Sequence, residues 1–358
     1  MRRFERIYDV VEPVEEYRRG GYHPVHLHDV LADRYEIIGK LAFGQFSTQV
    51  ALKILKAEAS ENNKELFMFL KLSDQSLEDY AGKKHVLELL DHFQHDGPNG
   101  THLCLVLPVM ISDGQQMTVN GRPRQAAYVR FISQQILLGI DFLHAQGIIH
   151  CDLQPANILV STIVDANSEM ILEPPEFSPV KWLEGTIPDD SAPEYLMPTQ
   201  RRRGELDRTE YSKLSVKIGD LGGAINDYQC DQKPVTPGGL RAPELIRQKP
   251  WDPRIDSWAL GCLIFELATN KPLFPLGVFG LSWEEIDEEH LHLINQLFGN
   301  ENTDRGFVKY LSDRLPPDFG TENIQQLASL LSLMLQIDPR KRASAGDLIN
   351  HPFLRSDE

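Results

Sequence analysis

One segment in the second half of the chain limits the possible folds more than any other. Residues 258–268 would be apolar on nearly all sides of a helix, so no face of that helix could be left in water. Such a helix has to lie in the middle of a large group of surrounding elements. Its 11 residues fall short of the roughly 20 that are needed to cross a bilayer. We therefore expect a large helical lobe built around residues 258–268.

The pattern of the other segments predicts a second, smaller lobe that is rich in strands. The β-prone runs are residues 35–41, 50–55 and 103–110. The helical runs are residues 62–72, 125–146, 291–298 and 324–335. In the first of these helices, Leu66, Phe69 and Leu70 have the spacing of an apolar face. The strands and one helix come first and most helices come later, which predicts an α+β fold with two lobes.

The composition of each segment also suggests where the parts of the chain begin and end. Residues 1–33 are polar and mixed in charge, which predicts an N-terminal extension without a core of its own. Residues 34–110 would form the small lobe and its connection to the large lobe, which would span residues 111–358. A Pro-, Asp- and Glu-rich stretch at about 161–214 has weak periodicity, so we expect a long surface insertion in the large lobe.

The charge balance excludes two classes of partner as first hypotheses. The chain has 36 Lys and Arg against 52 Asp and Glu, a formal net charge of −16. Nucleic acid and anionic membranes both attract clustered positive charge, so we expect no direct binding to either. The acidic residues could serve solubility alone or bind a basic substrate.

The four cysteines and the N-terminus bear on the compartment. None of the cysteines is in a CxxC pair, which disfavours a disulfide framework and a zinc site. The first residues lack the apolar core of a signal peptide. We expect a soluble protein of the cytoplasm and/or nucleus, where thiols stay reduced.

Two acidic loops carry the chemistry. The segment His150-Cys-Asp-Leu-Gln-Pro-Ala-Asn157 places Asp152 five residues ahead of Asn157, between a long helix and a short apolar run. In phosphoryl transfer, such a carboxylate orients the attacking hydroxyl and accepts its proton, while the amide oxygen holds Mg²⁺. Downstream, Asp220 lies in Lys217-Ile-Gly-Asp-Leu-Gly222 and is a candidate second ligand of Mg²⁺. Taken alone, each loop could instead hold an Asp that only caps a helix.

The order of further motifs makes chance a poor explanation. Lys53 ends the strand-like segment Val50-Ala-Leu-Lys53, and Glu65 lies on the helix that follows, so the two could form an ion pair. The later motifs are Ala242-Pro243-Glu244, Asp256-Ser-Trp258-Ala-Leu-Gly261 and Asp338-Pro-Arg-Lys-Arg342. Between about residues 35 and 354, the chain resembles the eukaryotic protein kinases.

Within that superfamily the chain is similar to the SR-protein kinases of the fungal type. The matching features are Gly20-Gly-Tyr-His-Pro-Val25, Phe46-Ser-Thr48, the DLG sequence at Asp220, the insertion before it, and Arg241. The segment at residues 289–297 resembles an insert of the same kinases. The resemblance implies a bilobal fold, ATP and Mg²⁺ as cofactors, and transfer of the γ-phosphate to Ser or Thr of Arg/Ser-rich proteins. We also expect a monomer.

The resemblance assigns a role to each matching residue. Lys53 would contact the phosphates, Glu65 would position it, Asp152 would be the base, and Asn157 and Asp220 would hold Mg²⁺. Further contacts to ATP would come from Gly44 in the phosphate-covering loop and from Pro108 and Met110 beside the adenine. Two structural roles are also implied: Glu244 would pair with Arg342, and Asp256 would brace the catalytic loop. Residues 105–110 could alternatively be a plain edge strand that ends at a proline.

Three features depart from the family's pattern. In the loop Leu41-Ala-Phe-Gly-Gln-Phe-Ser47, only Gly44 of the three expected glycines is present, and Ala42 replaces one of them. Only six residues separate Ser47 from Lys53, too few for the rest of a strand, a turn and most of another strand. About ten residues are missing, so the small lobe lacks a strand or the chain is an altered gene product.

The third departure lies in the catalytic loop. Gln154 stands where these kinases generally have Lys, which predicts a slower chemical step. Cys151 stands where many have Arg, which predicts that residues 224–240 do not switch by phosphorylation although Thr236 is present.

Two classes of function follow from these observations. The main hypothesis is a serine/threonine protein kinase that uses ATP and Mg²⁺, because Lys53, Glu65, Asp152, Asn157 and Asp220 are all present. The alternative is a catalytically impaired scaffold with the same fold, on the strength of the shortened loop, Ala42 and Gln154. Residues 284–289 hold five acids in six positions. They are either an exposed helix start or a docking site for an Arg-rich peptide.

Overall fold

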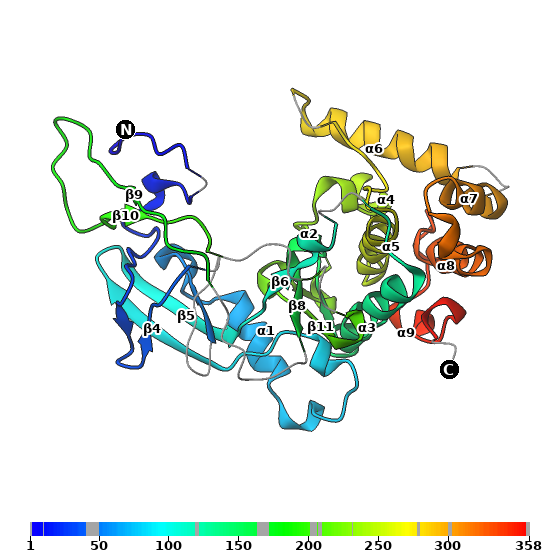
Figure 1. The fold of residues 1–358 in the computed structure, drawn as a ribbon, viewed down its shortest axis with the longest axis horizontal. Helices are drawn as coiled ribbons and strands as arrows, with labels where there is room; N and C mark the ends of the chain where they lie inside the picture. Colours follow the sequence, from blue (N-terminus) through cyan, green and yellow to red (C-terminus); the bar gives the residue numbers. More distant parts are fainter. Residues whose placement is uncertain are drawn as a thin grey trace. The chain divides into compact units, whose positions relative to one another are not determined.

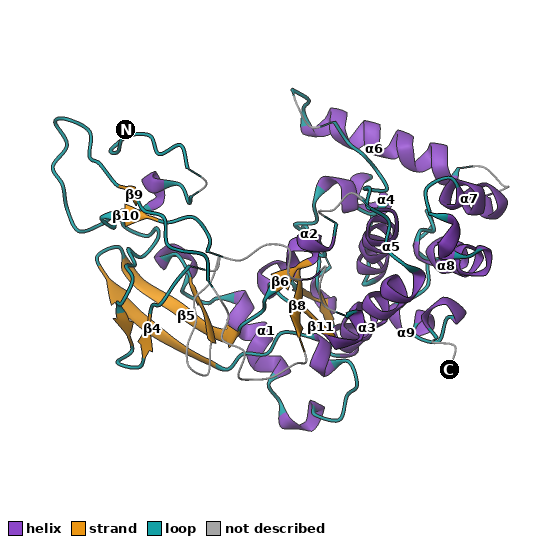
Figure 2. Ribbon diagram, in the orientation of Figure 1, coloured by secondary structure: helices purple, strands orange, loops and turns teal. Residues whose placement is uncertain are grey.

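A computed structural model describes residues 2–9, 11–40, 50–118, 122–162, 172–200, 206, 210–230, 232–277, 280–299 and 303–355. The chain forms two compact units. Unit 1 consists of residues 1–73, 87–111 and 164–205, and unit 2 of residues 74–86, 112–163 and 206–358. Figure 2 shows that strands make up most of the regular structure of unit 1, whereas unit 2 is mainly helical. The predicted α+β fold is therefore confirmed.

Unit 1 is built on a three-stranded antiparallel sheet. Its order is β3 (Val50–Ile54), β5 (Gly100–Pro108) and β4 (Asp91–Gly97). Figure 1 labels β4 and β5. Lys53 pairs with Leu105. A hairpin of β1 (Val30–Leu31) and β2 (Tyr35–Glu36) packs on one face of this sheet. The shared core contains Leu31, Val50, Leu52, Cys104 and Val106. A further pair consists of β9 (Ser178–Pro179) and β10 (Tyr195–Leu196).

The helix of unit 1 begins later than the sequence predicts and turns a different face inward. α1 (Lys64–Leu72) starts after Asn63, whose side chain accepts a hydrogen bond from the backbone N–H of Leu66. Its buried residues are Glu65, Met68, Phe69 and Leu72. Leu70, which we predicted on the apolar face, is 50% exposed. The inward face includes Glu65 because this carboxylate pairs with Lys53 on the sheet.

Unit 2 surrounds the helix that the sequence placed at its centre. In α5 (Arg254–Thr269), every residue from Ile255 onward is buried except Glu266. α5 packs against α3 (Ala126–Ala145) and α8 (Thr321–Met334), both near their predicted positions (Figure 1). The other helices are α2 (Gly114–Met117), α4 (Pro243–Ile246), α6 (Trp283–Phe298), α7 (Thr303–Ser312) and α9 (Ala345–Leu348). The predicted helix 291–298 is the second half of α6.

Two small sheets in unit 2 position the loops that contain Asp152 and Asp220. The first has the order β11 (Leu214–Ile218), β8 (Ile158–Thr162) and β6 (Ser112–Asp113). The second pairs β12 (Ile225–Asn226) with β7 (Ile148–Ile149). All these pairs are antiparallel. Both sheets join the segment around residues 148–162 to the segment around residues 214–226.

The boundaries of the two units differ from the predicted domain boundaries. Residues 164–205, which we predicted as part of the large lobe, group with unit 1. The reason is their contact with the N-terminal segment. Phe4 is fully buried and packs against Trp182, with 4.4 Å between ring centroids and ring planes tilted by 47°. Lys40 donates its backbone N–H to the Oε1 atom of Gln200 at 2.8 Å. The N-terminal segment therefore shares a core with the insertion.

A second difference concerns residues 74–86, which we placed in the small lobe and which group with unit 2. Val86 forms a parallel bridge to Ile218 at the end of β11. The Nδ1 atom of His85 lies 3.0 Å from the carbonyl oxygen of Val216. These contacts attach the segment after α1 to the first small sheet of unit 2.

Three findings concern the cysteines, the helix lengths and the clusters of metal-ligating side chains. The four cysteines are free thiols. Within the described residues, no helix is long and apolar enough to cross a membrane. In that same part of the chain, no cluster of three or more His, Cys, Asp or Glu side chains could hold a metal ion. Gly44 and Ala42 lie outside the described residues, and so does the start of the segment between Ser47 and Lys53 where we predicted that a strand is missing.

Candidate active site

Lys53 and Glu65 form a close, largely buried ion pair in unit 1. The Nζ atom of Lys53 donates to both carboxylate oxygens of Glu65, at 2.8 Å each. The side chain of Glu65 is 4% exposed and that of Lys53 is 23% exposed. A buried carboxylate of this kind needs its partner, because an unpaired buried charge is costly. The pair therefore fixes the direction of the Lys53 side chain.

The predicted adenine-binding segment lies at the end of β5. Pro108 is the last residue of this strand and pairs with Val50 at the start of β3. Proline has no N–H to donate, so it suits the end of a strand. Leu107 and Met110 are buried, each with 7% exposure. The contacts of Pro108 and Met110 with adenine remain a prediction.

In unit 2, Asp152 is held by the amide groups of two neighbours. The Nε2 atom of Gln154 donates to both carboxylate oxygens, at 3.0 and 3.1 Å. The Nδ2 atom of Asn157 donates to the Asp152 carbonyl at 2.9 Å and to its Oδ2 atom at 3.1 Å. Burial raises the pKa of Asp152 above its usual value, while the bonds from these amides act in the opposite direction. The sequence revealed the missing charge of Gln154 but not these bonds.

Asp256 braces the catalytic loop from α5, as predicted. Its carboxylate accepts hydrogen bonds from the backbone N–H groups of His150 and Cys151, at 2.8 and 3.0 Å. Its Oδ2 atom also lies 2.9 Å from the Nε2 atom of His144. Cys151 has a φ of 64°, a left-handed conformation that is uncommon for a residue with a side chain. The bonds to Asp256 hold the chain in this turn.

His150 supports the same loop from the inside. The backbone N–H of Asp152 donates to the Nδ1 atom of His150 at 3.2 Å, and the Nε2 atom lies 3.0 Å from the carbonyl oxygen of Gly219. A carbonyl oxygen only accepts, so the proton of the neutral ring has to lie on Nε2. The fully buried ring therefore connects the loop of Asp152 to the loop of Asp220.

The two predicted magnesium ligands flank adjacent strands: Asn157 precedes β8, and Asp220 comes after β11. Ile218 pairs with Ile158, and the backbone N–H of Gly219 donates to the carbonyl of Asn157 at 2.9 Å. Asp220 comes next, in a left-handed conformation with a φ of 56°, and its Oδ1 atom accepts from the N–H of Gly222 at 3.4 Å. The charge of Asp220 contributes to the raised pKa of Asp152. The β11–β8 pairing thus gathers Asp152, Asn157 and Asp220 at one end of the sheet.

The comparisons with known proteins agree with this geometry. The sequence model of the protein kinase domain matches residues 43–177 and 193–354. The chain belongs to the protein kinase family. The serine/threonine-protein kinase SRPK of Physarum polycephalum is 30% identical over 96% of this chain and 91% of that protein. The protein kinase dsk1 of Schizosaccharomyces pombe is 28% identical over 98% of this chain and 86% of that protein.

These relatives confirm the resemblance to the SR-protein kinases, and the chain is a serine/threonine protein kinase. A third relative, the serine/threonine-protein kinase SKY1 of Saccharomyces cerevisiae, is 37% identical over 42% of this chain and 23% of that protein. The matches favour the kinase over the alternative of an impaired scaffold.

The segment that follows Asp220 in this kinase is joined to the catalytic loop by a neutral contact. Thr236 is 5% exposed, and its hydroxyl donates to the carbonyl of Cys151 at 2.6 Å. The Nε atom of Arg241 donates to the Thr236 carbonyl at 3.3 Å, and its NH1 atom donates to Asp287 on α6 at 2.7 Å. Thr236 and Arg241 thus hold the later part of this segment through contacts that involve no phosphate. The sequence singled out Thr236, but only as a possible phosphorylation site.

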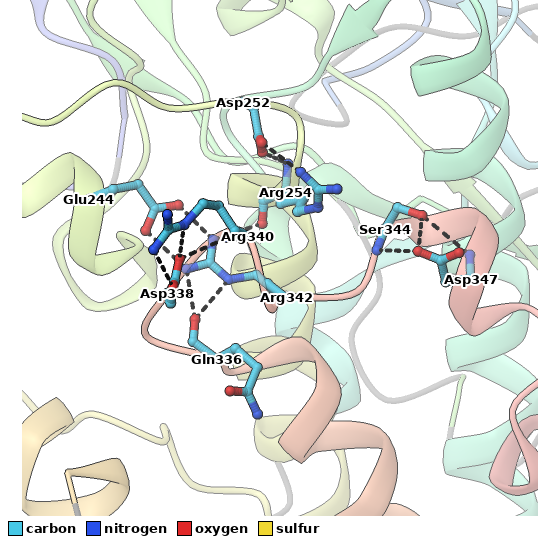
Figure 3. Close-up of polar contacts among 9 residues, drawn as sticks. All are labelled: Glu244, Asp252, Arg254, Gln336, Asp338, Arg340, Arg342, Ser344 and Asp347. Carbon is cyan, nitrogen blue, oxygen red and sulfur yellow. Dashed lines mark hydrogen bonds and ion pairs between the residues drawn. The ribbon is translucent and has the colours of Figure 1, made fainter.

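The predicted pair of Glu244 and Arg342 lies deep in unit 2 of the kinase. Figure 3 shows both nitrogens of the Arg342 fork directed at the carboxylate, with distances of 2.6 and 2.9 Å. The side chain of Arg342 is 0% exposed and that of Glu244 is 3% exposed. Arg342 also donates to the carbonyls of Gln336 and Arg254. A planar guanidinium suits such a site because it can serve several acceptors at once.

Proposed function

We propose that this kinase transfers the γ-phosphate of ATP to Ser or Thr residues of Arg/Ser-rich proteins. In this proposal Asp152 is the base, Lys53 contacts the phosphates, and Asn157 and Asp220 hold Mg²⁺. The observation that carries it is the arrangement of Asp152. Its carboxylate is fixed by Gln154 and Asn157 and lies at the same sheet end as the two candidate ligands.

The bonds around Asp152 suit a group that takes up a proton. The carboxylate would accept the proton of the substrate hydroxyl as that oxygen attacks phosphorus. Gln154 and Asn157 donate only N–H groups, so the carboxylate stays an acceptor and keeps its orientation. The raised pKa of Asp152 makes it a better proton acceptor than an ordinary carboxylate.

The residues present fit a magnesium ion that is held partly by the nucleotide. Both hydrogen bonds of the Asn157 side chain use its nitrogen, which leaves its oxygen for a cation. Mg²⁺ is commonly held by one or two protein groups together with substrate phosphates and water. Bound ATP with Mg²⁺ supplies the phosphoryl group and neutralises part of its charge. Lys53, fixed by Glu65, would add a positive charge beside the phosphates.

The substrate class rests on similarity and on charge. Two relatives are named as SRPK and dsk1, and the whole chain has a net charge of −16. At the start of α6, Glu284, Glu285 and Glu288 are exposed. This helix start has a capping box between Ser282 and Glu285, so the exposed helix start is confirmed. We propose that its remaining acids also attract Arg-rich segments of the substrate.

The test compares the native chain with Asp152→Asn, which keeps the size of the side chain but cannot accept the proton. Turnover of an Arg/Ser peptide should fall at least about a hundredfold, the usual share of a general base. Asp141→Asn on α3 is the matched control and should keep native turnover. Native turnover in Asp152→Asn would remove Asp152 from the role of base.

A second measurement separates catalysis from binding. The melting temperature of the native chain should rise with ATP and Mg²⁺, since a ligand of the folded state stabilises it by mass action. A rise without any turnover of the Arg/Ser peptide or of other Ser peptides would favour the scaffold. Turnover of a Ser peptide without arginine at the same kcat/KM would refute only the proposed substrate class.

A further inference from the structure

Unit 1 contains a cavity of about 360 Å³ that the kinase reaction does not use. Three segments form it: the N-terminal residues 12–40, strand β3, and residues 195–197 around β10. The match to the kinase domain begins at residue 43, so every lining residue of the N-terminal segment lies outside it, whereas residues 195–197 lie within it. Most of the wall therefore comes from parts of the chain that the general kinase domain does not include.

The cavity lies on the face of β3 that is opposite to Lys53. Leu52 and Ile54 line it, and Lys53 stands between them in the same strand. Successive side chains of a strand point to opposite faces of the sheet. The side chain of Lys53, which pairs with Glu65, therefore points away from the cavity. A ligand in the cavity would not occupy the place of the ATP phosphates.

The lining is mostly apolar and aromatic. Leu52, Ile54 and Ile37 come from the sheet and its hairpin, and Val25, Leu196 and Met197 come from the two segments that cover it. Tyr17, Tyr22 and Tyr195 add aromatic rings. Ligand pockets in proteins commonly have volumes of about 300–1,000 Å³ and this kind of lining. An apolar cavity of about 150 Å³ is already enough to hold benzene.

Besides the rings of His23 and His26, the lining has one polar corner without net charge. Glu12 and Lys40 form an ion pair there, with side chains that are 25% and 31% exposed. Lys40 also donates to the carbonyl of Met197 at 2.8 Å, and the hydroxyl of Tyr17 donates to Glu12 at 2.8 Å. Because each charge already has its partner, a charged ligand would gain little here and would lose its hydration.

We propose that this cavity binds a neutral aromatic molecule of two or three fused rings that carries one hydroxyl or amide group. The volume and the apolar lining accommodate the rings. The Glu12–Lys40 corner offers both an acceptor and a donor to the single polar group. The site depends on the contact between the N-terminal segment and the insertion, so it belongs to this fold rather than to the ATP site.

Calorimetric titration of the full chain with 2-naphthol tests the proposal. We expect saturable binding to one site that millimolar ATP with Mg²⁺ does not displace. Val25→Trp would fill the cavity from its wall, so its affinity for 2-naphthol should be at least tenfold lower. Val180→Trp, in the insertion but outside the lining, is the matched control and should bind like the native chain. The charged analogue 2-naphthoate should bind at least tenfold more weakly than 2-naphthol.

Several outcomes would overturn the proposal. Absence of saturable binding up to the solubility limit of 2-naphthol would do so, as would native affinity in Val25→Trp or displacement by ATP. Equal affinity for 2-naphthoate would refute the neutral ligand class. If circular dichroism shows that Val25→Trp is unfolded, Leu196→Phe fills the same space from the opposite segment and has to give the same loss.

Discussion

Gln154 has two opposite effects on the reaction of this kinase. Its amide donates to both oxygens of Asp152, which keeps the carboxylate in one orientation. The amide has no charge, so it cannot offset the negative charge that develops on a transferred phosphoryl group. Preorganised positive groups at such positions are a large source of catalysis. The residue therefore keeps the geometry of the site but gives up part of its electrostatic stabilisation.

We expect Gln154→Lys to raise kcat about tenfold, because the ammonium group restores a positive charge and can still donate to Asp152. Gln154→Leu should lower kcat, since it removes both hydrogen bonds at a similar side-chain volume. Steady-state kinetics at saturating ATP and peptide measure both changes, and melting temperatures control for folding. A native kcat in Gln154→Leu would show that these bonds do not assist the reaction.

The sequence motifs predicted the roles of some residues, but not the hydrogen bonds that depend on local geometry. The roles of Asp256 and of the Glu244–Arg342 pair followed from the resemblance to the protein kinases. The bonds of Gln154 could not follow, because they depend on the rotamer of a side chain whose type only indicated a lost charge. Thr236 is similar: its contact with Cys151 requires a turn of the backbone that no sequence pattern specifies.

Among the elements, α5 was easy to predict and α1 was difficult. A helix that is apolar on nearly all sides can only be buried, and α5 is buried along almost its whole length. α1 has apolar residues at most positions, so several faces compete. The face that carries Glu65 packs inward because this carboxylate pairs with Lys53, and Leu70 is left half exposed. The spacing of apolar residues alone does not predict which face of α1 is buried.

The pair of Glu244 and Arg342 ties α4 to the loop that follows α8. Arg342→Met would leave the Glu244 carboxylate buried without its partner. We expect the free energy of unfolding to fall by about 3–5 kcal/mol, the usual cost of breaking a buried pair. Urea unfolding followed by circular dichroism measures the change. Replacement of both partners, as in Glu244→Leu with Arg342→Met, should recover part of the loss.

Arg340 provides the matched control for this prediction. It lies two residues earlier in the same loop and pairs with Asp338, as Figure 3 shows. The side chain of Arg340 is 87% exposed, so water screens the pair. Arg340→Met should therefore leave the free energy of unfolding close to the native value. An equal loss for Arg340→Met and Arg342→Met would mean that burial does not set the cost.

At the scale of the whole molecule, the acidic excess should appear in the salt dependence of substrate binding. We expect the KM for an Arg-rich peptide to rise with ionic strength, since exposed charges are screened within about 8–10 Å. Glu284→Gln with Glu288→Gln should reduce this dependence while the capping residue Glu285 is kept. Glu176→Gln with Glu184→Gln, two exposed acids of unit 1, is the control of equal charge.

A salt-independent KM would leave the acids of α6 with a role in solubility only. An identical effect of both pairs of substitutions would show that total charge, and not the start of α6, attracts the peptide. Kinetic measurements over a range of sodium chloride concentrations distinguish these outcomes.

Contacts between distant segments were the least predictable part of the fold. Phe4 lies in a polar N-terminal stretch and Trp182 in a Pro-rich insertion, and each segment alone shows no periodicity that predicts a core. Their pairing in unit 1 is a property of the folded chain, because each covers the apolar side chain of the other. The assignment of residues 164–205 to unit 1 follows from such contacts.

The hairpin of β1 and β2 has a practical consequence for any shortened version of this kinase. A fragment that began at residue 43, where the kinase-domain match begins, would lose Leu31, Tyr35 and Ile37. The outer face of β3 and β5 would then present Val50, Leu52 and Val106 to water as one continuous apolar surface. Such a fragment would tend to aggregate, however complete its catalytic residues were. The N-terminal segment is needed to keep the small sheet soluble.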